Sequence, residues 1–234
     1  MNSITLVMAY FENAGQLERQ YNLLRTMPEH IKQNVHVIVV DDCSEDKPAH
    51  KAKLGMPCTL FRLNPPKIPW NQDAARNIGA HHAVTKWLLL TDMDHMVPVE
   101  TWNAITLSDL KEDRIYKFSR VSAPDYSPYK PHPNSWLMTK AMYDKIGGYD
   151  ERFAGWYGTD ADFRNRAAEC GTITLLSEVI IRVGREVVPD ASTTKFKRKD
   201  QDGLSEALRR IKAERNAIPG WRPLNLQFPY ERVT

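Results

Sequence analysis

Short apolar runs alternate with amphipathic segments through the first 90 residues, and this alternation limits the fold more than any other feature of the chain. The apolar runs are residues 3–10, 35–40, 58–63 and 87–90, and apolar side chains at helical spacing occupy residues 14–27 and 71–84. Strands that are apolar on both faces and separated by helices predict a mostly parallel sheet with helices on both sides. The expected fold class is therefore α/β.

Acidic residues follow two of these predicted strands at the point where each strand ends. Asp41 and Asp42 come directly after the run at 35–40, and Asp92 and Asp94 follow the run at 87–90. Open α/β sheets bind their ligands outside the carboxyl ends of the strands. Carboxylates that crowd together at such an edge repel one another, so a positive charge is expected among them.

The spacing of Asp92 and Asp94 suits a divalent cation. Mg²⁺ and Mn²⁺ prefer oxygen ligands and are often held by one or two carboxylates together with substrate phosphates. A solvated turn with capping aspartates is the alternative for so short a motif. The position of the pair after a buried strand favours the metal site.

Two other residues are candidates for contact with a nucleotide. A carboxylate such as Asp42, directly after a parallel strand, can accept hydrogen bonds from a nucleobase or a ribose. Arg76, in the segment DAARNIGA, has a planar guanidinium that suits a phosphate or a base carbonyl. The alternatives are a turn residue for Asp42 and a surface arginine for Arg76.

A second group of motifs lies in the segment GGYDERFAGWYGTDADFRNR, residues 147–166. Gly147 and Gly148 are predicted to end a helix that begins near Lys140. Trp156 and Tyr157 offer flat aromatic surfaces on which a sugar ring can pack. The segment therefore has the features of a sugar-binding loop.

Asp160 follows this loop at the predicted start of a helix. Thr159 is a good helix N-cap residue, which leaves the Asp160 carboxylate at the helix N-terminus. A carboxylate in that position can act as a general base toward an acceptor hydroxyl. The alternative is that Asp160 and Asp162 only complement the helix dipole.

The order of these motifs resembles that of nucleotide-sugar glycosyltransferases of the GT-A fold over nearly the whole chain. The strand ending near Tyr10, VVDDCS, ARNIG and the Asp-x-Asp pair are similar to the large inverting family 2. The segment at 147–166 resembles a motif of the β-1,4-galactosyltransferases. The resemblance implies one domain over residues 1–234, with a nucleotide-binding half at 1–98 and an acceptor- and sugar-binding half at 99–234.

The resemblance also implies a role for individual residues. It places the nucleotide donor against Tyr10, Asp41, Asp42, Arg76 and Asp92, and the sugar and acceptor against Trp156, Tyr157, Gly158 and Asp162. Asp160 falls where the catalytic carboxylate of these families falls. Tyr157 and Thr159 replace a glycine and a glutamate of the galactosyltransferase motif, and Cys43 replaces a glycine that is usual in family 2.

The same resemblance implies that Asp94, with Asp92, binds Mn²⁺ or Mg²⁺. The galactosyltransferases supply a histidine from a later strand, but this chain has Val183 in that place. The third ligand is therefore expected to be His95, His132 or water.

The implied reaction moves a sugar from a UDP-sugar to an acceptor hydroxyl with inversion of the anomeric configuration. A nucleotidyltransferase is an alternative on a related sheet, but the first strand is not followed by the glycine-rich phosphate loop expected of that class. A carbohydrate-binding protein without catalysis is a third possibility, and it would need neither the Asp-x-Asp pair nor Asp160.

Composition limits the partners and the location. The net charge of +3 in 234 residues does not by itself indicate nucleic acid. The basic run KFKRKD, with Lys195, Lys197, Arg198 and Lys199, leaves an anionic acceptor such as a base in DNA as an alternative to a saccharide. The three cysteines predict no disulfide framework, and no apolar run approaches the roughly 18 residues of a membrane span. We expect a cytoplasmic protein without integral membrane association.

Overall fold

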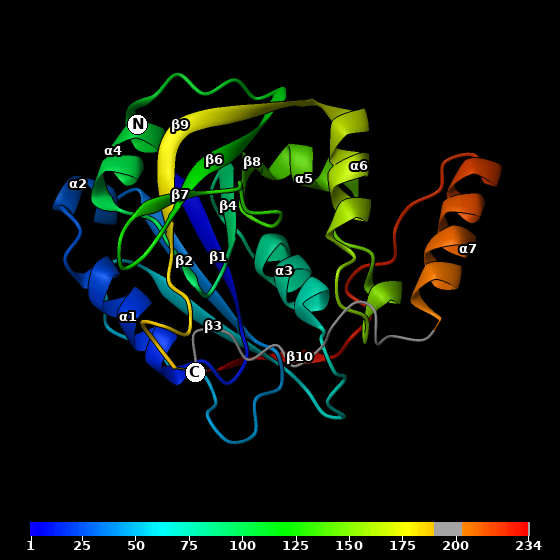
Figure 1. The fold of residues 1–234 in the computed structure, drawn as a ribbon, viewed down its shortest axis with the longest axis horizontal. Helices are drawn as coiled ribbons and strands as arrows, with labels where there is room; N and C mark the ends of the chain where they lie inside the picture. Colours follow the sequence, from blue (N-terminus) through cyan, green and yellow to red (C-terminus); the bar gives the residue numbers. More distant parts are fainter. Residues whose placement is uncertain (190–202, 234) are drawn as a thin grey trace.

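The computed structural model describes residues 1–189 and 203–233, and its strands form one continuous ten-stranded sheet (Figure 1). The strand order is β10-β3-β2-β1-β4-β8-β6-β9-β5, and β7 pairs with β6. The strands are β1 (Ile4–Tyr10), β2 (Val35–Asp41), β3 (Cys58–Leu63), β4 (Trp87–Asp92), β5 (His95–Met96), β6 (Arg114–Ser122), β7 (Ser127–Tyr129), β8 (Trp136–Thr139), β9 (Thr172–Arg182) and β10 (Tyr230–Val233).

The four strands predicted in the first 90 residues are present and parallel. β1 lies between β2 and β4, and β2 pairs with β3 on its other side. The register sets Tyr10 opposite Asp41 and Ala9 opposite Asp92. Asp41 and Asp92 therefore lie at the same carboxyl edge of the sheet, as expected.

The rest of the sheet is mixed. β8 is antiparallel to both β4 and β6, β9 is parallel to β6, and β5 is antiparallel to β9. At the opposite edge, β10 returns from the end of the chain to pair antiparallel with β3. The α/β class is confirmed, and parallel order is concentrated in the N-terminal half.

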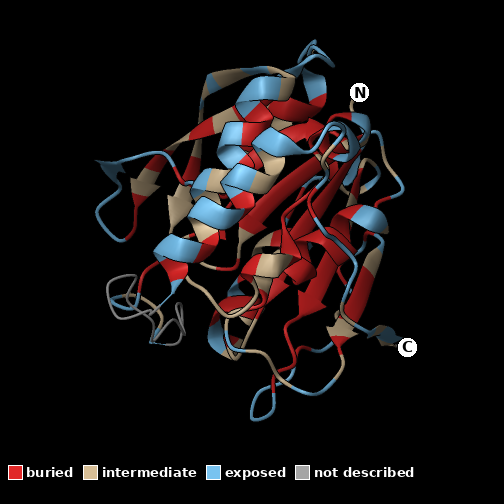
Figure 2. Ribbon diagram, turned by 90° about the vertical axis from the view of Figure 1, so that its right-hand side faces the viewer, coloured by how far each residue is buried: buried red, intermediate tan, exposed pale blue. Residues whose placement is uncertain are grey.

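Helices cover both faces of the sheet, and alternate residues of β1 face them. Ile4, Leu6, Met8 and Tyr10 belong to a core that also contains residues of α1 (Ala14–Arg25), α2 (Glu29–Lys32) and α4 (Val99–Leu107). Val7 and Ala9 belong to the opposite cores, with residues of α3 (Gln72–His81), α5 (Lys140–Ile146) and α6 (Asp160–Cys170). Figure 2 shows the strands buried between helices whose outer faces are exposed.

Gly79 lets α3 pack closely on β1. A Cβ atom at this position would lie 2.2 Å from Cγ1 of Val7, which is fully buried. Real Cβ atoms do not approach other carbons so closely, so any side chain here would push the helix away from the strand. The glycine of ARNIG thus sets the depth at which Arg76, on the same helix, meets the sheet.

The second half differs from the expectations in detail. α5 ends at Ile146 because Gly147 adopts a left-handed φ of 90°, as predicted for this glycine. A short 3-10 helix, η1 (Glu151–Phe153), follows. Residues 127–129 form the short strand β7, which pairs antiparallel with the end of β6. α7 (Leu204–Ala217) follows residues 190–202, so the KFKRKD run lies outside the described residues. Within the described ranges, no helix is both long and apolar enough to cross a bilayer.

Candidate active site

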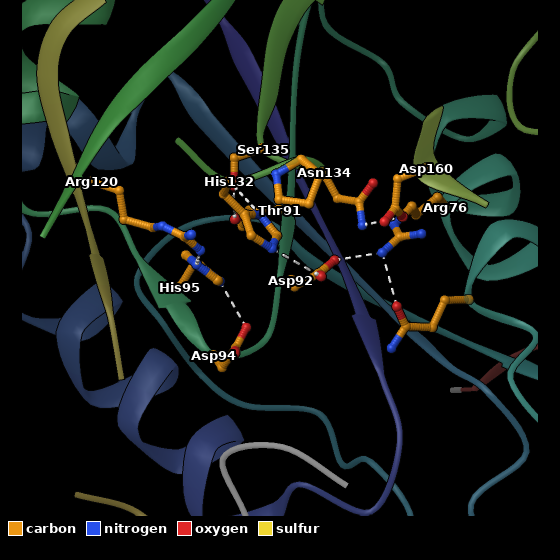
Figure 3. A network of polar contacts seen from close by, with 12 residues as sticks. Arg76, Thr91, Asp92, Asp94, His95, Arg120, His132, Asn134, Ser135 and Asp160 are labelled. Atoms are coloured by element: carbon orange, nitrogen blue, oxygen red, sulfur yellow. Dashed lines mark hydrogen bonds and ion pairs between the residues drawn. The ribbon is translucent and has the colours of Figure 1, made fainter. Parts of the chain in front are cut away.

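The positive charge expected among the carboxylates is Arg76. Its guanidinium is 2% exposed and reaches from α3 to the end of β4, where Nη2 donates to Oδ1 of Asp92 at 2.6 Å. Figure 3 shows this contact with Asp92. Nη1 of Arg76 donates to Oδ1 of Asp73 at 2.9 Å. Burial alone would raise the pKa of Asp92, but the Arg76 guanidinium holds it well below its usual value. Asp92 is therefore ionised at neutral pH.

His132 approaches Asp92 from the other side. Its Nε2 lies 3.4 Å from Oδ2 of Asp92, and its Nδ1 is 2.9 Å from the hydroxyl of Ser135. That hydroxyl is in turn 2.9 Å from the hydroxyl of Thr91 on β4. Burial, and the neighbouring His95, lower the pKa of His132 well below its ordinary value, so the imidazole is neutral.

Asp94 is coupled to His95 and Arg120. Nη1 of Arg120 lies 2.8 Å from Nε2 of His95, and an arginine can only donate. Nε2 therefore accepts, and Nδ1 of His95 carries the proton that it donates to Oδ1 of Asp94 at 2.7 Å. Both ring nitrogens of His95 are thus engaged, so His95 does not have a lone pair for a metal.

The carboxylates suit a metal site that leaves positions for substrate oxygens better than a site formed by protein ligands alone. In the described part of the chain, no three His, Cys, Asp or Glu side chains are arranged to hold a metal ion. Asp94 is 24% exposed, and its Oδ2 has no hydrogen-bond partner among the described residues. One or two carboxylates with phosphate oxygens and water are a usual set for Mg²⁺, so Asp94, with Asp92 beside it, suits an ion that arrives with a diphosphate.

Asp42 and Asp41, predicted to contact the nucleotide, are both buried. Oδ1 of Asp41 accepts from the amide of Ser44 at 2.9 Å, and Oδ2 accepts from the amide of Ala49 at 2.8 Å. Asp42 pairs with Lys67 at 2.8 Å and accepts from a backbone amide. Burial raises the pKa of Asp42 to about 6, against the opposing effect of Lys67. Asp41, which also pairs with Arg62 at 3.3 Å, thus holds the loop after β2, whereas Asp42 pairs with Lys67.

Tyr10 is also engaged within the chain. It is 1% exposed, and its hydroxyl donates to the carbonyl of Lys47. Tyr10 and Asp41 therefore hold the same loop from two sides, and neither is placed for direct contact with a ligand in this conformation.

Asp160 lies at the start of α6, as predicted, but Thr159 does not cap the helix with its side chain. The Thr159 hydroxyl instead lies 3.4 Å from Oδ2 of Asp73. Oδ1 of Asp160 accepts from Nδ2 of Asn134 at 2.7 Å. Asp160, Asp92 and Arg76 thus belong to one cluster between β4, α3 and α6 (Figure 3).

Tyr157 is influenced by three acidic side chains of the site. Its pKa is raised by burial and then by the charges of Asp160, Asp92 and Asp94. Its ring packs edge-on against Trp70, with 4.7 Å between centroids. The Tyr157 hydroxyl is therefore subject to the charges of both the candidate base and the candidate metal ligands.

The other predicted sugar-binding residues are less uniform. Trp156 is partly buried in the same loop, and Gly158 has a φ of 89° that favours glycine. Asp162 points elsewhere: its Oδ2 is 2.9 Å from Arg166, and its Oδ1 is 3.9 Å from Arg215. The structure thus brings Trp156, Tyr157 and Gly158 into one loop and directs Asp162 toward α7.

Sequence reasoning missed the role of Asn77. Its Oδ1 accepts from the Tyr149 amide at 2.8 Å and the Tyr143 hydroxyl at 2.6 Å, and its Nδ2 donates to Tyr149 and Glu151. A Cβ at Gly148 would lie 2.7 Å from Oδ1 of Asn77. Asn77 of the ARNIG motif therefore packs directly against the Gly-Gly motif. In the sequence, only its position next to Arg76 indicated that Asn77 has a role in the site.

Asp73 and Asn134 were also missed. Asp73 is one turn before Arg76 on α3, and burial raises its pKa to about 7 against the effect of Arg76. Asn134 lies in an irregular segment whose sequence, HPNS, has no recognisable motif. Only the fold places that segment beside Asp160.

Residues 5–175 match the model of Glycosyl transferase family 2. The chain belongs to this family. A curated relative from Haemophilus influenzae, an uncharacterized glycosyltransferase, is 35% identical over 74 residues, which are 31% of this chain and 24% of the relative. The match therefore spans about a quarter of that relative.

Solved structures of glycosyltransferases share the fold of this family 2 chain. S. aureus TarS 1–349 in complex with UDP-GlcNAc has a TM-score of 0.67 and 15% identity, over 93% of this chain and 67% of that one. GalNAc-T7 with UDP, GalNAc and Mn²⁺ has a TM-score of 0.61 and 16% identity, over 79% of this chain and 43% of that one. The mannosyltransferase PcManGT from Pyrobaculum calidifontis, with GDP-Man and Mn²⁺, has a TM-score of 0.57 and 14% identity, over 77% and 56%. The GT-A fold and the glycosyltransferase class expected from the sequence are confirmed.

Proposed function

We propose that this chain transfers a sugar from a UDP-sugar to the hydroxyl of a saccharide acceptor, with a divalent metal and with inversion of the anomeric configuration. The observation that supports this most directly is the cluster of Asp92, Arg76 and Asp160. Arg76 interacts with Asp92, at the end of β4 where the donor is expected, and with Asp160, the carboxylate at the start of α6.

Each residue has a distinct task in the proposal. Asp94 and Asp92 would hold the metal with the donor diphosphate, and Arg76 keeps Asp92 ionised and in place. When bound, Mn²⁺ or Mg²⁺ would offset the negative charge that develops on the leaving diphosphate. Tyr157 belongs to the loop directly before Asp160.

Asp160 receives the proton of the acceptor hydroxyl as its oxygen attacks the anomeric carbon. The bond to the leaving diphosphate breaks on the opposite face of the sugar, which inverts the configuration. The positive charge of the oxocarbenium-like sugar is matched by the nearby carboxylates. TarS and GalNAc-T7 were solved with UDP-GlcNAc and with UDP, which supports the choice of a uridine donor.

A panel of nucleotide sugars tests the donor and the metal together. We expect UDP to raise the melting temperature more with Mn²⁺ than with EDTA, because a ligand that binds only the folded state stabilises it. Asp94→Asn should abolish the Mn²⁺-dependent part of that increase while leaving the melting temperature without ligand unchanged. Equal increases with Mn²⁺ and with EDTA would contradict the metal–diphosphate site.

Asp160→Asn tests the base. The amide keeps the size of the side chain but does not accept the acceptor proton, so kcat should fall by about 100-fold or more. UDP affinity should stay unchanged. Glu100→Gln, an exposed first-turn carboxylate on α4, is the matched control and should keep full activity. Near-normal turnover by Asp160→Asn, or a product that retains the donor configuration, would refute the inverting mechanism with this base.

A further inference from the structure

Asn134 connects to the candidate base from a segment on the other side of the site. The side chain is 6% exposed, and its Nδ2 donates to Oδ1 of Asp160 at 2.7 Å. Its own Oδ1 lies 3.4 Å from the hydroxyl of Tyr149. Asn134 thus sits between a phenol and a carboxylate, with both ends of its amide in use.

The contact divides the two oxygens of Asp160. Oδ1 accepts the hydrogen bond from Asn134, and Oδ2 has no hydrogen-bond partner within residues 1–189 and 203–233. A hydrogen bond from an amide to a carboxylate is charge-assisted and directional, so it restricts rotation of the carboxylate. The unpartnered oxygen is the one that remains for a substrate proton.

We propose that Asn134 is a positioning residue that fixes Oδ1 of Asp160 and thereby presents Oδ2 to the acceptor hydroxyl. This inference rests on the proposed role of Asp160 as the base. Nothing in the sequence motifs assigns Asn134 such a task.

The orientation of the amide is itself determined by its surroundings. Tyr149 stacks on Phe163 of α6, with 4.2 Å between ring centroids and 8° between ring planes. Its hydroxyl can donate to the oxygen end of the amide, which turns the NH₂ end toward Asp160. The reverse orientation would set the amide oxygen against a carboxylate oxygen.

The segment that contains Asn134 is held at several points. Lys117, on β6, donates its ammonium protons to the carbonyls of His132 and Pro133. Ser135 bonds to Thr91 on β4. The segment is therefore fixed to the sheet on both sides of Asn134, as positioning of a base requires.

Other charged and titratable groups also face Asp160, and they stay in place when Asn134 is changed. They are Asp73 and Arg76 from α3, Lys117 from β6, and Tyr149 and Tyr157 from the segment before α6. A change in kcat of Asn134 variants can therefore be assigned to the lost hydrogen bond.

Asn134→Leu, which is similar in size but has no donor, tests the inference. Loss of a hydrogen bond to a charged group corresponds to about 10- to 100-fold, so kcat should fall by that factor with the KM for the donor unchanged. Asn134→Gln, which keeps a donor, should restore part of the rate, which a role in packing alone would not predict.

Asn165→Leu is the matched control, since Asn165 is an exposed asparagine on the same helix as Asp160, and it should leave kcat unchanged. If Asp160→Asn is inactive but Asn134→Leu has normal kcat, the inference is wrong and the base assignment stands. If Asp160→Asn is active, the proposed function itself fails. Should Asn134→Leu not fold, Tyr149→Phe gives the test: it removes the hydroxyl that holds the oxygen end of the amide, so a normal kcat there would overturn the inference.

Discussion

Asp42 should make the free protein less stable at neutral pH, and replacement by asparagine should reveal this. Burial raises the pKa of Asp42 from 3.8 to about 6, although Lys67 opposes the increase. Between these two values the unfolded chain has lost the proton and the folded chain still holds it. Folding stability therefore falls as pH rises through this window and levels off above it.

The size of the effect follows from the two pKa values. A separation of about two pH units corresponds to about 3 kcal/mol of unfolding free energy, and about half of that is lost between pH 5 and pH 8. Asp42→Asn removes this term because an amide does not titrate. The stability of Asp42→Asn relative to wild type should thus rise by about 1.5 kcal/mol between pH 5 and pH 8.

Urea denaturation of both proteins at pH 5 and pH 8 measures this change. The comparison across pH cancels any constant cost of the substitution, such as the weaker bond to Lys67. Lys67→Met should steepen the loss of stability with pH, because it removes the cation that opposes the raised pKa of Asp42. Parallel stability curves for wild type and Asp42→Asn would refute the reasoning. UDP should bind Asp42→Asn more weakly if Asp42 contacts the nucleoside.

Two further substitutions test the packing that supports the site. Gly79→Ala should destabilise the fold by about 1–3 kcal/mol in urea denaturation, since its Cβ would meet Val7 at 2.2 Å. Val7→Ala in the same chain should recover part of this loss, and additive costs of the two substitutions would contradict the proposed clash. Glu151→Gln should speed hydrogen exchange at the amides of Leu226 and Gln227, which donate to its two carboxylate oxygens, and unchanged exchange there would show that these bonds do not hold the segment.

The parallel half of the fold was predictable because its information is local. Each strand in residues 3–90 is a mostly apolar run, and helices separate β1 from β2 and β3 from β4. Parallel order then places Asp41 and Asp92 at one edge without further assumptions. The end of α5 was predictable for the same reason, since Gly147 alone accounts for it.

Contacts within the site were harder to predict because they join residues that are distant in sequence. Asn134 and Asp160 are separated by 26 residues, and Arg76 and Asp92 by 16. Residue type also misled: Asp41 and Asp42 look equivalent, yet Asp41 accepts two amides of the loop after β2, whereas Asp42 accepts the amide of Asn71, at the start of α3. Likewise His95 and His132 are equal candidates as metal ligands in the sequence, whereas in the fold Arg120 donates to Nε2 of His95.

The return of β10 to the edge of β3 has a practical consequence for anyone who shortens this chain. Without residues 230–233, the backbone amides and carbonyls of β3 that now pair with β10 would become an open edge in a sheet made of apolar strands. Such edges recruit strands from other molecules. A version cut after α7 should therefore self-associate even though β1 to β9 are all still present.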